Sequence, residues 1–197
     1  KLEFDPTVYP YPSRRYALFA TKGMACTSTP QSAQVGLEIL KKGGNAIDAA
    51  VAMAACQSVV EPVSNGIGSD AFALVWTKGK LYGLNASGWS PKALTADMLR
   101  AKGLTEMPVY GWDAITVPGA PAAWAALAER FGRLSLSELV EPASRYAEEG
   151  YPVALNVASG WQRHHHHFSK QQGEEFKPYF DEFTIDGRAP RAGEVFR

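Results

Sequence analysis

The sequence has no excess of charge and few cysteines. Its 197 residues hold 20 lysines and arginines against 20 aspartates and glutamates, and no basic run is longer than a pair such as Lys41-Lys42. A nucleic-acid-binding domain needs a clustered basic surface, so nucleic acid is excluded as a partner. Two cysteines, Cys26 and Cys56, exclude a disulfide scaffold in a chain of this size and leave the redox compartment open.

The sequence also lacks a stretch long enough to cross a bilayer. Its most apolar segment, residues 46–59, is shorter than the run of about 20 apolar residues that a membrane-spanning helix needs. We therefore expect no membrane partner. The N-terminal stretch shows no basic region followed by an apolar core and a small-residue cleavage site. The cytoplasm is the expected compartment, with secretion open if a signal preceded Lys1.

Common catalytic signatures are missing as well. The G-x-S-x-G pentapeptide of serine hydrolases does not occur. The glycines of Gly66-Ile67-Gly68 precede an apolar strand pattern and no Gly-Lys-Ser/Thr follows them, so they predict a turn and not a phosphate-binding loop. The histidines, residues 164–167, are far from both cysteines in the chain. We expect them to form a solvated polar face, and we expect no metal and no cofactor.

The chain is organised around residues 41–76. Gly43-Gly44 ends one helix, and Asn45 is a good N-cap for the next. Residues 46–59 are small or apolar on almost every face, which predicts a helix buried all round. Asp48 stands at the third helical position, where an acid completes a capping box, so we expect a structural role for it.

Short strands and helices alternate along the rest of the chain. The first expected elements are an extended N-terminal arm, a strand over 23–28, a helix from Thr29-Pro30, a strand over 71–76 covered on both faces, and its hairpin partner over 81–86. They are followed by a helix over 96–102, a strand over 114–118 and helices over 119–131 and 136–149. In the last of these, Pro142 should start a new helix or kink the old one. Asp70, at the entry to the buried strand, should have a partner, with a backbone amide favoured over a substrate. The pattern indicates an α+β fold.

The domain division predicted from composition has three parts. Residues 1–20 form the extended arm, 21–150 the core of helices and sheet, and 151–197 a mainly helical exposed lobe. The strands are too few to cover the apolar helix, so we expect the chain to be incomplete at its C-terminal end and the missing part to bury that helix.

Three stretches carry a family resemblance. Gly43–Ala49 reads GGNAIDA, Val60–Pro62 is followed by Gly66–Gly68, and Pro118-Gly119 comes later, in that order and at matching spacing. With these motifs the chain resembles the gamma-glutamyltranspeptidase family over about residues 23–153. A loop that continues as Ser69-Asp70-Ala71 resembles the glutathione hydrolase-like subgroup.

The resemblance implies the N-terminal-nucleophile hydrolase fold, a four-layer αββα sandwich. It implies a proenzyme that cleaves itself before a threonine, whose hydroxyl and α-amine act as nucleophile and base. That threonine belongs to the small subunit, so this chain, the N-terminal part of the large subunit, supplies no catalytic residue. The implied activity is hydrolysis or transfer of the γ-glutamyl group of glutathione or of related amides, without metal or cofactor.

One departure concerns the substrate. Where the family has an arginine that pairs with the α-carboxylate of the glutamyl group, residues 85–91 read NASGWSP. The matching positions make Ser87, Gly88 and Trp89 the expected substrate-binding residues, unless Trp89 packs against the N-terminal arm. Alternatives are a cephalosporin-acylase-like amidase, in which Trp89 lines an apolar acyl pocket, and a non-catalytic homologue that acts as a binding or structural protein.

Overall fold

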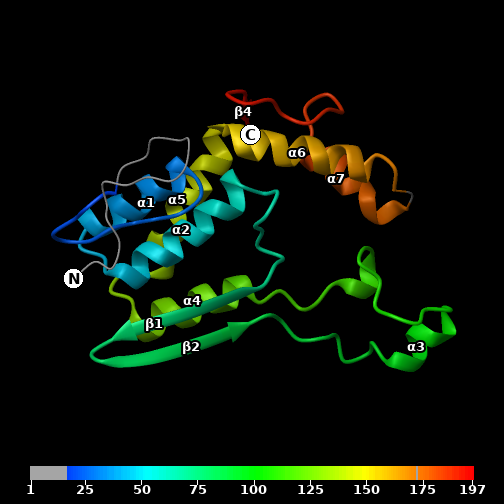
Figure 1. Cartoon of the computed structure of the whole chain (residues 1–197), viewed down its shortest axis with the longest axis horizontal. Helices are drawn as coiled ribbons and strands as arrows, with labels where there is room; N and C mark the ends of the chain where they lie inside the picture. The colour runs from blue at the N-terminus through cyan, green and yellow to red at the C-terminus, as the bar shows by residue number, and fades with distance from the viewer. Residues whose placement is uncertain (1–16, 172) are drawn as a thin grey trace.

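Helices form most of the regular structure (Figure 1). The computed structural model describes residues 17–171 and 173–197, so residues 1–16 of the expected arm lie outside it. The helices are α1 (Pro30–Lys41), α2 (Ala46–Val60), α3 (Ala96–Ala101), η1 (Trp112–Ala114), α4 (Ala120–Phe131), α5 (Leu136–Glu149), α6 (Leu155–Phe168), η2 (Glu174–Phe176) and α7 (Lys177–Glu182). The strands are β1 (Ala71–Thr77), β2 (Lys80–Ala86), β3 (Tyr151–Pro152) and β4 (Val195–Phe196). The chain is α+β, as expected.

Helix α2 is at the centre of the core. It is the expected apolar helix. One side of it is buried, whereas Ala46 and Ala50 are exposed and five further residues, Ile47, Met53, Ala54, Ser58 and Val59, are half-buried. Helices α1, α4 and α5 pack around it, and α1 and α5 lie beside it in Figure 1. We expected a missing part of the protein to bury this helix. Three helices of the same chain provide much of the cover, and the expectation that a missing part of the protein covers the rest stays a prediction.

Local sequence signals set the helix ends. The Asn45 side chain accepts from the N–H groups of Ile47 and Asp48, and the Asp48 carboxylate accepts from the Asn45 N–H, so the predicted capping box is present. Gly43, with φ of 96°, takes the left-handed conformation after α1. Helix α5 continues through Pro142 as one helix, so the new helix start, one of the two outcomes expected at this proline, does not occur.

Strands β1 and β2 form the predicted antiparallel hairpin, with Ala71 opposite Ala86. The tight turn has positive φ at Lys78 and Gly79, as a two-residue hairpin loop requires. One face of the hairpin packs on α4. The other is exposed, contrary to the expectation that β1 is covered on both faces, and carries large apolar side chains: Phe72, Leu74, Trp76 and Leu81.

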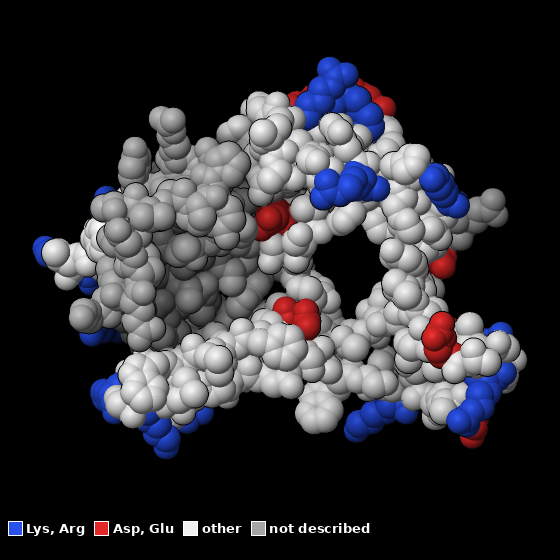
Figure 2. Space-filling model, viewed as in Figure 1, with Lys and Arg blue, Asp and Glu red and all other residues white. Residues whose placement is uncertain are grey.

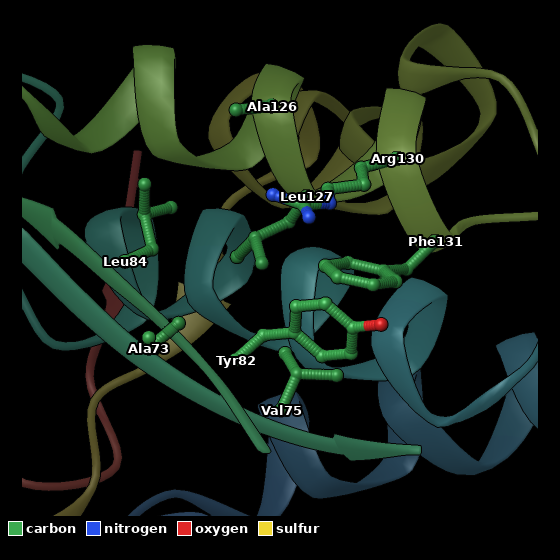
Figure 3. A pocket seen from close by; sticks show the side chains of 9 residues that line it. Ala73, Val75, Tyr82, Leu84, Ala126, Leu127, Arg130 and Phe131 are labelled. Atoms are coloured by element: carbon green, nitrogen blue, oxygen red, sulfur yellow. The ribbon is translucent and has the colours of Figure 1, made fainter. Parts of the chain in front are cut away.

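The contact between the hairpin and α4 is well packed. The rings of Tyr82 and Phe131 meet edge to face with centroids 5.1 Å apart, and the Arg130 guanidinium lies 4.9 Å from the Tyr82 ring centroid. Figure 3 shows these side chains around a small cavity with Leu84 and Leu127 at its border. At about 70 Å³ the cavity is far below the size of a ligand site, so it is a packing gap.

Two expected strands do not form. Residues 23–28 have no regular secondary structure and pair with no strand in the described part of the chain. Residues 115–118 follow the short helix η1, and instead of a ladder they have a single backbone bond to another segment, from the Val117 N–H to the Trp89 carbonyl at 2.9 Å. Strand pairing depends on a distant partner, which an apolar run alone does not specify.

The segment 87–118 meets the C-terminal helices around Tyr110, whose ring contacts both His167 and Phe168. The Tyr110 and His167 rings are tilted by 36° to each other, with centroids 4.7 Å apart. Figure 2 shows an opening through the molecule in this view. Trp161 anchors α6 on the core, since it is buried and its indole N–H donates to the Phe183 carbonyl at 2.8 Å. Within the described residues, no helix is long and apolar enough to cross a bilayer.

Candidate functional site

Three segments that are distant in the sequence meet at the start of α4. The carbonyl oxygen of Ser69, in the loop after α2, accepts from the N–H groups of Gly119 and Ala120, both at 3.0 Å. The segment before α4 is also tied to the end of β2 through the bond between Val117 and Trp89. Loop 61–70, the stretch after β2 and the start of α4 therefore form one hydrogen-bonded unit.

Two glycines allow this close approach. Gly88 has φ of 82°, and a Cβ atom there would overlap the Val117 carbonyl oxygen. A Cβ atom on Gly119 would overlap the Ala86 carbonyl oxygen and crowd the Gly88 N–H. Neither position can accept a side chain without a backbone shift, so the crossing of 86–88 with 117–119 requires both glycines.

A groove of about 700 Å³ lies along this crossing. Its size is in the range of small-molecule sites, and its lining is mainly apolar. The lining residues are Leu84, Asn85, Ala86, Ser87, Gly88, Trp89, Val117, Pro118, Gly119, Ala122, Ala123 and Ala126. No charged side chain is among them. On the face drawn in Figure 2, lysine and arginine side chains lie mostly around the outline, away from the middle of the molecule.

The structure brings the three predicted substrate-binding residues to this groove. Ser87 is held by its N–H, which donates to Asn85 Oδ1 at 3.0 Å, and by its carbonyl, which accepts from Thr116 Oγ1 at 3.4 Å. Trp89 is 83% exposed, so it packs little against the described residues. Their role in substrate binding stays a prediction.

Sequence reasoning missed the opposite wall of the groove, which α4 provides. Ala122 and Ala126 lie one turn apart on this helix and leave room above the backbone. The alanine-rich sequence after Pro118-Gly119 was the available signal. It predicted the helix, but the helix face that meets residues 87–89 depends on the long-range contact through Ser69.

The histidines do not form a metal site. His165 Nε2 lies 2.9 Å from the Gly187 carbonyl, and the His164 and His167 rings pack against Phe168. Among the described residues, no group of three or more potential ligands is close enough to hold a metal ion. His164, His165 and His167 are half-buried and pack against neighbours, whereas His166 is exposed, so the expected solvated polar face is found at His166 only.

Asp70 differs from its prediction. Its side chain is exposed, and no hydrogen bond to its carboxylate is found among the described residues, so the expected amide partner is absent. The reason is that the sheet face beside it is itself uncovered. Asp48, in contrast, is fully buried and also accepts from the Arg133 N–H at 3.0 Å, so its predicted structural role is confirmed.

Comparison with known proteins places these features in context. The family model of gamma-glutamyltranspeptidase matches residues 32–197. The chain is 40% identical over 186 residues to the glutathione hydrolase-like YwrD proenzyme of Bacillus subtilis. The matched stretch covers 91% of this chain and 34% of that protein. It therefore spans about a third of the length of that curated relative.

Solved structures give the same picture. The cephalosporin acylase from Bacillus halodurans is similar with a TM-score of 0.91 and 55% identity, over 100% of this chain and 37% of that one. The gamma-glutamyltranspeptidase of Helicobacter pylori is similar with a TM-score of 0.80 and 30% identity, over 91% of this chain and 52% of that one.

Proposed function

Because the chain belongs to the gamma-glutamyltranspeptidase family, we propose that it is the N-terminal part of the large subunit of an amidase that works through a threonine acyl-enzyme. The threonine, in the remaining part of the proenzyme, attacks the amide carbonyl with its hydroxyl while its α-amine takes the proton. The amine product leaves, and water or an acceptor amine then releases the acyl group. No metal or cofactor takes part in this scheme.

We further propose the four-layer αββα sandwich as the fold of the complete protein. The exposed face of the β1–β2 hairpin supports this, since Phe72, Leu74, Trp76 and Leu81 are each more than half exposed. A contiguous exposed apolar surface of this kind is rare on a complete, monomeric soluble protein. The second sheet, supplied in part by the small subunit, covers this face in our proposal.

The groove beside residues 87–89 is the observation that carries the functional proposal. It holds the acyl part of the substrate, with the reacting carbonyl directed toward the small subunit. Hydrolysis or transfer of the γ-glutamyl group of glutathione or a related amide is the first candidate reaction. Ser87 and Asn85 are the polar side chains along the groove that can bond to the amino and carboxylate groups of such a substrate.

A second candidate acyl group is apolar. The groove has no lysine or arginine in its lining, and a carboxylate is difficult to hold without a bidentate guanidinium. Trp89 offers a large apolar surface in its place. The likeness to the Bacillus halodurans cephalosporin acylase also supports an amidase that accepts a non-glutamyl acyl group.

The test compares two anilides on the full-length protein. One carries a γ-glutamyl group and the other an uncharged aliphatic acyl group of similar length, and the ratio of their kcat/KM values decides between the two candidates. Mass spectrometry of the purified protein shows whether the chain is cleaved before a threonine. A cleaved protein that turns over neither anilide, or a protein with no such threonine, would support the non-catalytic homologue.

A further inference from the structure

A polar network links the start of α1 to the end of α2. Gln57 Oε1 on α2 accepts from the hydroxyls of Thr29 at 2.6 Å and Ser32 at 2.7 Å. The amide of Gln57 donates from Nε2 to Glu61 Oε2 at 2.8 Å. The Ser28 hydroxyl donates to the same carboxylate oxygen at 2.5 Å. The Glu61 carboxylate is thereby fixed to the beginning of α1 and to α2.

Glu61 also holds the loop that follows it. Its Oε2 accepts from Asn65 Nδ2 at 3.2 Å. Its backbone carbonyl accepts from the N–H groups of Ser64 at 3.1 Å and Asn65 at 3.2 Å. Since Glu61 is the C-cap of α2, the chain changes direction at this residue. The first half of loop 61–70 is therefore set by one glutamate.

The second half of the loop reaches the groove. The N–H and hydroxyl of Ser69 donate to the Gly66 carbonyl at 3.2 and 2.6 Å, which closes a turn. The carbonyl of the same serine receives the N–H groups of Gly119 and Ala120 at the start of α4. Hydrogen bonds thus lead in sequence from the Glu61 carboxylate to the wall of the groove, although Glu61 does not line the groove itself.

From this continuity we infer that Glu61 is a positioning residue for the groove. Its carboxylate fixes Asn65 and with it loop 61–70, and the Ser69 carbonyl at the end of this loop fixes the start of α4 against residues 86–89. The inference rests on the proposed function for its kinetic consequence alone. The structural consequence, a loosened start of α4 when Glu61 is lost, holds whatever the substrate.

Hydrogen exchange in the full-length protein reports on this link directly. Pro118 and Pro121 have no amide hydrogen, so the only backbone N–H groups in residues 118–121 are those of Gly119 and Ala120, which the Ser69 carbonyl holds. In Glu61→Ala we expect both amides to exchange about tenfold faster. Glu61→Gln keeps an acceptor oxygen and should restore most of the protection.

Two further variants separate positioning from general stability. Asn65→Ala removes the side-chain link to the loop without touching Gln57, and should also speed exchange at the Gly119 and Ala120 amides. It therefore serves as the test if Glu61→Ala does not fold. Glu138→Ala is the matched control, because it removes a capping-box carboxylate from α5, which contributes no residue to the groove. Equal acceleration in Glu138→Ala, or unchanged exchange in both loop variants, would overturn the inference.

Kinetics give the second readout. Glu61→Ala should raise KM for the anilide that the wild type prefers by about threefold to tenfold, with a smaller change in kcat, since a displaced groove binds the acyl group less well. Glu138→Ala should leave KM unchanged. If the wild-type protein hydrolyses neither anilide, the proposed function fails, whereas the exchange experiment still decides whether Glu61 positions α4.

Discussion

Asp48 on α2 binds the backbone of Arg133, 85 positions further along the chain, through N–H to carboxylate distances of 3.0 and 3.1 Å. The same buried carboxylate caps its own helix through the Asn45 N–H at 2.8 Å. One side chain therefore fixes the start of the central helix and the turn between α4 and α5. Gly132 is part of this arrangement, since a Cβ atom there would lie 2.6 Å from Asp48 Oδ1.

The first prediction concerns this carboxylate. Asp48→Asn keeps the size of the side chain but turns an amide donor toward backbone N–H groups, so we expect a loss of about 2–3 kcal/mol in the free energy of unfolding of the full-length protein. Denaturant unfolding measures it. As a control, Glu38→Gln changes a carboxylate in the exposed bond with Gln34 and should shift stability by no more than about 0.5 kcal/mol.

The second prediction concerns acyl specificity. Trp89→Arg places a guanidinium at the groove, and kcat/KM for the γ-glutamyl anilide should rise by an amount equivalent to about 1–3 kcal/mol. Trp112→Arg makes the same change at an exposed tryptophan outside the groove and should have no effect. No rise in Trp89→Arg, together with a bound substrate far from residue 89, would contradict the site assignment.

The third prediction is a pH dependence near the C-terminal end of the described chain. Arg188 pairs with both oxygens of Glu194, and together with the Arg191 N–H it lowers the pKa of the Glu194 carboxyl from 4.5 to about 2. The stabilisation should be complete above about pH 4.5 and disappear as the pH falls through about 2.

The difference in Tm between wild type and Glu194→Gln, followed from pH 6 downward, measures this effect. It should shrink over that acidic window. Glu174→Gln alters the exposed pair with Lys177 and serves as the control, with a small difference throughout. A Glu194 difference that grew as the pH fell would contradict the assignment.

The fourth prediction concerns the thiols. Cys56 is fully buried, and burial raises the pKa of its thiol, whereas Cys26 is exposed. Because the thiolate is the reactive form, a water-soluble thiol reagent should modify Cys26 alone in the native protein and both cysteines after unfolding. Peptide mapping after labelling gives the answer, with Cys26→Ser as the control that should remain unlabelled.

The fifth prediction concerns residues 1–197 expressed alone. The apolar side chains on the open face of β1 and β2 have no cover within the described residues, so we expect this piece to self-associate and to show no amidase activity. Size-exclusion chromatography and an anilide assay test both points. A monodisperse monomer that turns over substrate would show that the nucleophile lies within this chain.

Local signals predicted the helices well. Asn45 and Asp48 reveal a helix start because the bonds they make span three residues, and Gly43 reveals an end because few other residues take its conformation. The second cover of β1 is missing from the described residues, for a physical reason. An apolar run predicts that a strand is buried, but it does not identify the element that covers the strand.

The candidate site was predictable in part. Matching motif positions pointed to Ser87, Gly88 and Trp89, and these residues do share a groove. The contact between Ser69 and the start of α4 joins positions 50 apart in the chain, so no spacing rule could reveal it. The polar network around Glu61 could not be predicted for the same reason. Each of its residues is of a type that is also common at helix ends and turns.

The crossing of Gly88 and Gly119 has a consequence for how such a protein can change its substrate over evolution. At these two points there is no room even for a methyl group, so mutation has nothing to vary there. New acyl preferences are accessible through the flanking positions, above all Trp89 and Ala122, whose side chains border the groove without supporting the crossing. We therefore expect the frame of the groove to be inherited unchanged while its lining diversifies.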